Sequence, residues 1–326
     1  MNIMYPIKFT PILKPKIWGG SKLIDILGKS SERRDIGESW EISDVENDVS
    51  IISNGELKGK TLREVISLYK GKLVGDKVYE VFGEKFPLLI KFIDAKTTLS
   101  IQLHPNDKLA RDRHNSFGKT EMWYVMQADE DANLIVGFKE NVSKESYLKH
   151  LENKNLLDIL NVEKVSHGDI YYIPTGRIHA IGAGVMLAEI QQTSDITYRV
   201  YDWDRKDSSG NYRELHTNLA IDAIDFEAQD NYKTPYHKNK NTATEVVNCP
   251  FFTTNILPLN GEISIDHSDK NSFVIYMCVQ GDATFHYDNQ ETKIKCGETC
   301  LIPASLKNFK ITSNINTELL EVYIDL

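Results

Sequence analysis

The chain has 326 residues, 41% of them hydrophobic and 26% charged, with a formal net charge of −9 at pH 7. These values predict a globular protein of about two domains, and the negative charge argues against a nucleic-acid partner, because phosphate binding needs clustered cations. We expect a cytoplasmic protein without a membrane partner, since no apolar run reaches ~18 residues, no secretory signal opens the chain, and the few cysteines form no disulfide framework.

Short runs rich in Ile, Val, Tyr and Phe dominate the chain and predict strands. In chain order they are Leu88–Phe92, Leu99–His104, Glu121–Val125, Asp169–Ile173, Met186–Gln191, Ile196–Tyr201, Phe273–Val279 and Leu319–Ile324. Helical signals are few. A capping box from Thr61 to Glu64 predicts a helix to about Tyr69, and Ser143 is the expected cap of a second helical stretch. The polar segment 225–244 predicts a linker.

One short motif occurs twice. Residues 168–179 read GDIYYIPTGRIH and residues 297–308 read GETCLIPASLKN, so both fit the frame G-x5-P-x-[GS]-x2-[HN]. Upstream, Met126–Asp129 resembles Val279–Asp282, with a longer spacing between the copies. The extra length matches the helical stretch, which indicates one β unit used twice with a helical insertion in the first copy.

The spacing of the frame resembles the second motif of the cupins, small jelly rolls whose interior holds a metal. We therefore predict a mainly β protein made of two cupin units. The first, residues 1–235, is expected to be catalytic and to contain helical inserts at about 60–80 and 140–163. The second, residues 236–326, is expected to hold no metal, because Asn308 replaces His179 and Val274 replaces Glu121 in the repeat.

Candidate metal ligands come from three segments of the first unit. Gln102 and His104 are two residues apart in a predicted strand, so both face the same side. Glu121 opens the next predicted strand, and His179 closes the first copy of the repeated motif. Two imidazoles, a carboxylate and an amide oxygen suit Zn²⁺, which predicts one zinc ion per chain. A single histidine on a strand is more often a hydrogen-bonded core residue, so the prediction depends on the four residues together.

Longer segments resemble the type I mannose-6-phosphate isomerase (phosphomannose isomerase) family in its short bacterial form. The similar segments are Phe9–Gly20, Gly37–Ser43, Phe86–Asn106, Lys119–Glu121 and Ser194–Arg199. This resemblance implies the same four zinc ligands and an active-site role for Arg199. It also implies catalytic-pocket positions for Lys91, Lys119 and Asp195. The sequence departs from the longer family members after Arg199 and in its reduced helical region.

The implied reaction interconverts mannose 6-phosphate and fructose 6-phosphate through an enediol, so the implied partner is a phosphorylated hexose. Ser100 shares the strand face of Gln102 and His104 and is a candidate for substrate phosphate binding. The proton-transfer base and the choice between monomer and homodimer stay open. Two alternatives are a non-haem iron cupin oxygenase, which uses two histidines and one carboxylate, and a sugar-binding bicupin without turnover.

Overall fold

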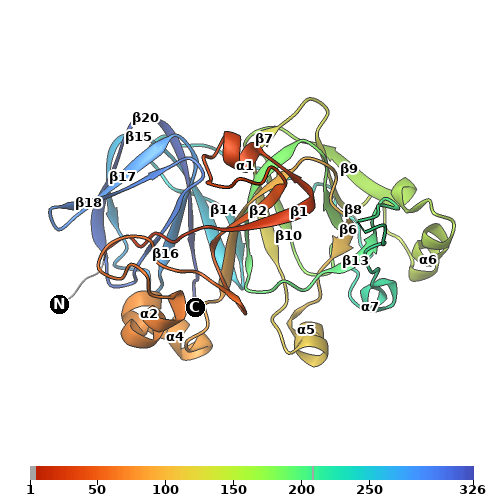
Figure 1. Cartoon of the computed structure of the whole chain (residues 1–326), viewed down its shortest axis with the longest axis horizontal. Helices are drawn as coiled ribbons and strands as arrows, with labels where there is room; N and C mark the ends of the chain where they lie inside the picture. The colour runs from red at the N-terminus through yellow and green to blue at the C-terminus, as the bar shows by residue number, and fades with distance from the viewer. Residues whose placement is uncertain (1–4, 208) are drawn as a thin grey trace.

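The computed structural model describes residues 5–207 and 209–326, so the first four residues of the predicted first unit lie outside the description. The chain is built mainly from antiparallel strands with short helices at the periphery (Figure 1), which confirms the predicted mainly β fold class. In the described ranges, the helices are all too short or too polar to cross a bilayer.

The first half of the chain forms two sheets that face each other. In hydrogen-bonding order, the six-stranded sheet contains β1 (Ile12–Gly20), β2 (Ile36–Ile42), β5 (Leu88–Ala95), β12 (Val185–Gln192), β7 (Glu121–Ala128) and β10 (Ile170–Ile173). The five-stranded sheet contains β13 (Tyr198–Tyr201), β6 (Ile101–Leu103), β11 (His179–Ile181), β8 (Asn133–Phe138) and β9 (Leu160–Lys164). A small hairpin pairs β3 (Asp44–Val45) with β4 (Asp48–Val49).

Side-chain alternation gives the six-stranded sheet two different faces. On β5, Ile90 and Phe92 belong to a hydrophobic cluster that continues into the C-terminal sheet. Between them, Lys91 points to the opposite side and lines a cavity. On β7, Met122 joins the same outer cluster, whereas Trp123 faces inward. The inner face of this sheet therefore carries both apolar and charged residues, and the site is built on it.

The five-stranded sheet closes the other side of the cavity. Ile101 and Leu103 of β6 pack outward with Tyr147 and Leu156 of the helical insertion. Gln102 lies between them in sequence and lines the cavity, as strand parity predicts. The site is thus enclosed between two sheets, each of which is covered on its outer face.

The helices are short and lie outside the sheets. They are α1 (Lys22–Asp25), α2 (Leu62–Tyr69), α3 (Gly71–Val74), α4 (Asp76–Phe82), α5 (Asp107–His114), α6 (Lys144–Glu152), the 3-10 helix η1 (Leu156–Ile159) and α7 (Thr217–Ile221). The capping box at Thr61 and Glu64 and the Ser143 cap are confirmed. The predicted second insert extended to residue 163, but helical structure ends at Ile159. Residues 160–164 pair instead with β8, so that part of the prediction is corrected.

The last part of the chain forms a seven-stranded sheet, in which β17 and β18 form a hairpin that pairs with β20. Its strands are β14 (Thr244–Cys249), β15 (Phe252–Asp266), β16 (Val274–Gln280), β17 (Asp282–Tyr287), β18 (Gln290–Lys295), β19 (Thr299–Ile302) and β20 (Asn308–Tyr323). The repeat is visible in the strand register: Glu121 lies opposite Ile173 in one half, and Val274 lies opposite Ile302 in the other. Gly168 and Gly297 both have positive φ, +89° and +83°, in the turn before the strand that a proline follows in each copy of the motif.

The helices α2–α4 pack against the second half of the chain, although they precede most of the first half in sequence (Figure 1). The backbone N–H of Phe273 donates to Val74 O (3.1 Å), and that of Ala304 donates to Leu73 O (2.8 Å). Residues 224–243 contain no helix or ladder strand, and Tyr232 attaches them to the first half by a hydrogen bond to Phe138 O (2.9 Å). We propose residues 235/236 as the boundary between the two units.

Candidate active site

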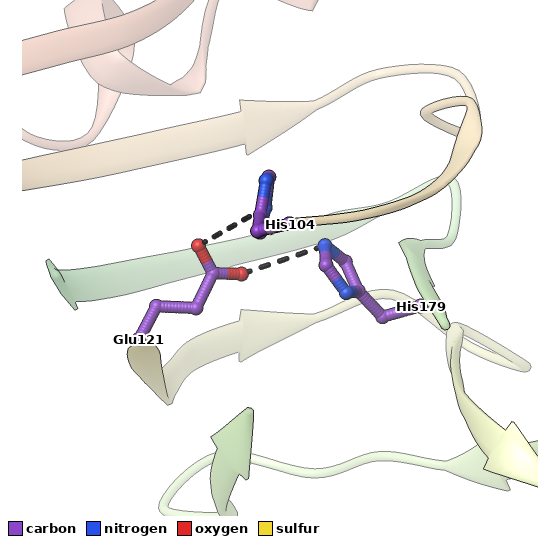
Figure 2. Close-up of side chains that lie close together, drawn as sticks. All are labelled: His104, Glu121 and His179. Atoms are coloured by element: carbon purple, nitrogen blue, oxygen red, sulfur yellow. Dashed lines mark ion pairs between the residues drawn. The ribbon is translucent and has the colours of Figure 1, made fainter. Parts of the chain in front are cut away.

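Three buried side chains meet inside the first unit: His104, Glu121 and His179 (Figure 2). His104 follows β6, Glu121 opens β7 and His179 opens β11, so the contact joins the two facing sheets. The Nε2 atom of His104 lies 3.5 Å from Glu121 Oε2, and that of His179 lies 3.6 Å from Glu121 Oε1. All three ligand atoms lie within 4.8 Å of one another, which is compatible with binding to one cation.

Both imidazoles are oriented by the backbone. Nδ1 of His104 lies 2.8 Å from the carbonyl oxygen of Ile196, and Nδ1 of His179 lies 2.9 Å from that of Arg177. A carbonyl oxygen only accepts, so Nδ1 carries the hydrogen and Nε2 keeps its lone pair directed toward Glu121. Burial lowers the pKa of both residues, that of His179 to about 3, so both are neutral at pH 7. Neutral imidazole is the form that binds metals.

Gln102, the fourth predicted ligand, lies beside this cluster. It is the cross-strand neighbour of His179, and its side-chain amide nitrogen lies 3.4 Å from His179 Nε2. Its Oε1 accepts a hydrogen bond from the Ser100 hydroxyl at 3.2 Å. Rotation of the amide exchanges the oxygen and the nitrogen, so Gln102 can also present an oxygen to the cluster.

The residues fit a bound cation. Glu121 Oε1 is buried and has no hydrogen-bond partner within the described part of the chain. An unpartnered buried carboxylate oxygen is costly unless a ligand satisfies it. Burial is also the main reason that the pKa of Glu121 is raised, even with Lys119 beside it, so a bound cation would favour the ionised carboxylate. Two imidazole nitrogens and a carboxylate oxygen are donors typical of a catalytic zinc site.

Lys119 contacts two of the three clustered residues. Its Nζ donates to Glu121 Oε2 (2.5 Å) and lies 3.0 Å from His104 Nε2. The predicted shared face of Lys119 and Glu121 is therefore confirmed. Because the ammonium lies at atoms that a bound metal would use, Lys119 would provide positive charge directly beside such a metal, and it also lines the cavity.

A second group of polar residues lies on the same inner face of the six-stranded sheet. Lys91 Nζ contacts Glu189 Oε1 at 3.0 Å and Gln191 Oε1 at 2.7 Å, and Trp123 Nε1 donates to Glu189 Oε2 at 2.9 Å. Burial favours the neutral form of Lys91, but Glu189 and Glu38 outweigh it and raise the pKa, so Lys91 stays an ammonium. Lys91 and Lys119 in turn hold the pKa of Glu189 below its ordinary value despite burial.

Sequence reasoning missed Glu189 and Glu38. Glu38 accepts a hydrogen bond from Trp40 Nε1 (2.6 Å) and lies 3.3 Å from Lys16 Nζ. A usable signal was present, because both glutamates interrupt otherwise apolar strands at inward-facing positions. A charged residue at such a position is rare without a partner.

The remaining predicted residues line the same cavity. Ser100, Asp195 and Arg199 all contribute to the lining, together with Arg213, which sequence reasoning did not identify. Arg199 lies opposite Gln102 in the strand register, and its Nη1 donates to the carbonyl oxygen of Glu214 (2.8 Å). Asp195 is exposed, and no hydrogen bond joins it to Arg199 among the described residues.

The arrangement combines a cation-compatible cluster, three ammonium groups and two guanidinium groups around one cavity. Such a site can bind an anionic substrate and stabilise negative charge that develops on it. It can also hold an acidic or basic group next to a carbon–hydrogen bond, as proton-transfer reactions require.

Comparison with known families gives two matches along the chain. The model of the phosphomannose isomerase type I catalytic domain matches residues 7–133, and that of the mannose-6-phosphate isomerase cupin domain matches residues 242–324. The second match confirms the predicted cupin character of the C-terminal part of the chain, residues 242–324.

Similar proteins extend over almost the whole chain. The mannose-6-phosphate isomerase ManA of Bacillus subtilis is 34% identical over 309 residues, which are 94% of this chain and 95% of that protein. The mannose-6-phosphate isomerase of Streptococcus mutans is 34% identical over 95% of this chain and 96% of its own. The crystal structure of a B. subtilis mannose 6-phosphate isomerase covers 98% of this chain and 99% of its own, with a TM-score of 0.88 and 34% identity. The structure described as that of a putative mannosephosphate isomerase from Archaeoglobus fulgidus shares the fold over 100% of both chains, with a TM-score of 0.80 and 22% identity.

Proposed function

Because the chain belongs to the type I mannose-6-phosphate isomerase family, we propose that it interconverts mannose 6-phosphate and fructose 6-phosphate through an enediol, with one zinc ion. The observation that carries this proposal is the cluster of His104, Glu121 and His179, whose ligand atoms lie within 4.8 Å of one another. Gln102 completes the proposed ligand set. Zinc bound there supplies Lewis-acid stabilisation of negative charge on the substrate oxygens.

The reaction moves one proton between two neighbouring carbons. The open-chain aldose loses the proton on C2, the enediol forms, and a proton is added at C1. The protein must therefore bind the open chain, stabilise the negative charge on the oxygen, and exchange a proton beside the two carbons. The cavity between the two sheets contains residues suited to each of these tasks.

Lys91 and Lys119 are assigned to charge stabilisation. Lys91 stays protonated because Glu189 and Glu38 raise its pKa despite burial, so it acts as a fixed positive charge in the cavity lining. Lys119 lies nearer the cluster, with its Nζ 3.0 Å from His104 Nε2. Positive charge that is already in place costs no reorganisation when the enediolate forms.

Arg199 and Asp195 are assigned to the substrate side of the cavity. The guanidinium group of Arg199 presents a planar set of donors that matches two oxygens at once, and its Nε is buried without a partner among the described residues. Asp195 is exposed at the cavity edge, where it can orient a substrate hydroxyl or exchange a proton with water. Ser100 offers a hydroxyl on the face that it shares with Gln102.

Family membership argues against the two alternative functions, a non-haem iron oxygenase and a sugar-binding protein without turnover. The iron oxygenase would use the same two histidines and carboxylate, but the cavity also contains ammonium and guanidinium groups suited to a phosphorylated substrate. The non-catalytic sugar-binding protein would be expected to lack ligands in both halves, whereas the first half retains them.

Solvent isotope incorporation tests the enediol. The enzyme is incubated with fructose 6-phosphate in D₂O, and the mannose 6-phosphate formed is analysed by NMR spectroscopy and mass spectrometry. Proton exchange through an enediol places deuterium at C2 of the product. Rapid conversion with no deuterium at C2, even at long incubation times, would support a direct hydride shift and contradict the proposed mechanism.

A further inference from the structure

Cationic side chains outnumber the carboxylates that line the cavity. Three of the cations have carboxylate partners: Lys91 contacts Glu189, Lys119 contacts Glu121, and Lys16 contacts Glu38. Arg199 and Arg213 also line the cavity, and neither forms an ion pair with a carboxylate of the lining among the described residues. Burial lowers the pKa of Arg199, and the nearby charge of Arg213 lowers it further.

Arg213 donates two hydrogen bonds to the buried carboxylate of Asp202. Its Nε and Nη2 donate to the two carboxylate oxygens of Asp202, at 2.7 and 2.5 Å. Asp202 is 5% exposed, whereas the Arg213 side chain is 24% exposed, so the carboxylate is buried and the guanidinium group stays accessible from the solvent side. The remaining nitrogen, Nη1, makes no hydrogen bond within the described ranges of the chain. Asp202 therefore fixes the direction of Arg213 and leaves one of its donor edges free.

Arg205 shares Asp202 but has a different role. Its Nη2 donates to Asp202 Oδ1 at 2.7 Å, and its Nη1 donates to the carbonyl oxygen of Thr98 at 3.0 Å. It is not part of the cavity lining. Nearby, Trp203 Nε1 donates to the carbonyl oxygen of Leu99 at 2.8 Å. These contacts attach the turn after β13 to the segment before β6.

The register between β6 and β13 shows which residues lie toward each end of the cavity. The strands are antiparallel, with Arg199 opposite Gln102 and Tyr201 opposite Ile101. Moving along β13 from Arg199 toward Asp202 therefore means moving along β6 away from His104 and toward Ser100. The metal-ligand cluster lies at one end of this strand pair, and Ser100 and Asp202 lie at the other. Two residues on a strand span ~6.6 Å, which is roughly the reach of a hexose phosphate from C2 to its phosphoryl group.

We propose that Arg213, aimed by Asp202, binds the phosphoryl group of the substrate at the end of the cavity opposite the metal ligands, with the Ser100 hydroxyl beside it. This inference rests on the proposed function and names the residues that recognise the phosphoryl end. Arg213 is a substrate-binding residue, and Asp202 is a positioning residue that acts through it. Two guanidinium groups repel each other in the empty cavity, and a dianionic phosphate removes that repulsion.

Binding and kinetics of zinc-loaded variants test the proposal. The probe is mannitol 6-phosphate, an unreactive open-chain analogue, with mannitol as the form lacking phosphate, and both are titrated by calorimetry. Turnover is measured with mannose 6-phosphate. Arg213→Ala is expected to weaken mannitol 6-phosphate binding and to raise KM about 30-fold, with kcat within about 3-fold of the parent enzyme. Arg213→Lys keeps the positive charge but loses the planar guanidinium group. Its KM and its affinity for mannitol 6-phosphate are expected to lie between those of the parent enzyme and those of Arg213→Ala.

Asp202→Asn separates positioning from folding. This variant keeps the shape of Asp202, and it is expected to raise KM for mannose 6-phosphate about 10-fold while kcat stays near that of the parent. Arg33→Ala is the matched control, because it removes one arginine charge from an exposed ion pair with Asp35 and should change neither constant.

The outcomes are distinguishable. Unchanged mannitol 6-phosphate binding in Arg213→Ala would overturn the proposal and leave the proposed isomerase function intact. If Arg213→Ala does not fold, unchanged KM in both Arg213→Lys and Asp202→Asn would overturn it equally. A parent enzyme that does not convert mannose 6-phosphate would contradict the proposed function, and the calorimetric comparison would then decide the phosphate site alone.

Discussion

Glu189 and Glu321 occupy equivalent positions in the two halves of the chain. Glu189 lies opposite Trp123 in the strand register, and Glu321 lies opposite Tyr276. In each half the aromatic side chain donates a hydrogen bond to the glutamate: Trp123 Nε1 at 2.9 Å from Glu189 Oε2, and Tyr276 Oη at 3.1 Å from Glu321 Oε2. The internal repeat thus extends to a buried aromatic–carboxylate pair that neither copy of the short motif contains.

Each glutamate also faces a residue on its other neighbouring strand, and this residue differs between the two halves. Glu189 also lies opposite Lys91, whereas Glu321 lies opposite Asn255. In the second half the cation nearest Glu321 is Lys270, at 3.5 Å, which comes from outside the paired strands. The first half therefore keeps an ammonium on the inner sheet face, where a substrate can use it, and the second half does not.

The substitution Glu189→Gln tests the role of the Lys91–Glu189 ion pair on the inner sheet face. The change removes the charge that keeps Lys91 protonated and in place, so we expect kcat to fall by about 10- to 100-fold. Zinc content should stay near one per chain, because Glu189 contacts none of the proposed ligands. Steady-state kinetics and metal analysis measure both quantities. Loss of zinc together with activity would instead make Glu189 part of the metal site.

The matched control is Glu321→Gln, the same substitution at the equivalent position. We expect unchanged kcat, since this residue lies in the second unit. The free energy of unfolding should fall by about 1–3 kcal/mol, because a buried hydrogen-bonded charge is lost. Urea denaturation provides the measurement.

Arg199→Ala is expected to lower kcat about 100-fold and to leave zinc near stoichiometric. Arg199 lines the cavity opposite Gln102 but is not among the residues that contact His104, Glu121 or His179 in the described part of the chain. Kinetics and metal content are measured on the same preparation. A variant that has lost its metal would show that Arg199 supports the fold of the site rather than the reaction.

Lys119→Met is expected to change metal affinity and activity in opposite directions. The ammonium lies at the ligand atoms of His104 and Glu121 and opposes a second cation there. Without it, zinc should bind about 10-fold more tightly in competition with a chelator, while kcat falls at least 100-fold. Weaker zinc binding in the variant would contradict the placement of Lys119 beside the metal.

His267 is expected to make stability depend on pH in the second unit. Burial, together with Lys270, lowers the pKa of His267 to about 4. The unfolded chain therefore binds more protons than the folded chain between about pH 4 and about pH 6.5, and stability rises with pH across that window. Above it, the contribution is constant.

The variant His267→Gln isolates this contribution from those of the other buried histidines. The free energy of unfolding of the parent rises between pH 5 and pH 7, and in the variant this rise should be smaller by about 1–3 kcal/mol. The exposed His237→Gln is the control, and its pH dependence should match that of the parent. Denaturant unfolding at the two pH values measures the change in the free energy of unfolding. The same change in all three proteins would refute the role of His267 in the pH dependence.

The metal-ligand candidates could be predicted because their placement is local. Gln102 and His104 share a face by strand parity, and Lys119 and Glu121 do so for the same reason. Glu189, Glu38 and Arg213 could not be placed in the same way. Their contacts depend on which strands become neighbours, and the order β5–β12–β7 joins segments that are far apart in sequence.

Strand boundaries were less predictable than strand existence. The expected strand Leu99–His104 is only Ile101–Leu103, because Pro105 follows His104 and disfavours continued strand pairing. At the other extreme, the expected strand Leu319–Ile324 is the end of the 16-residue strand β20. Polar residues in the middle of that strand hide it from a hydrophobic pattern, because they lie in its exposed part.

The proposed zinc dependence is tested most directly by a coupled assay with mannose 6-phosphate. Activity and metal content are measured on one preparation as isolated, after chelation, and after zinc is added back. Activity should disappear with the metal and return in proportion to zinc, with saturation at one ion per chain. Full turnover by metal-free protein would contradict the assignment of His104, Glu121 and His179 as ligands of a catalytic ion.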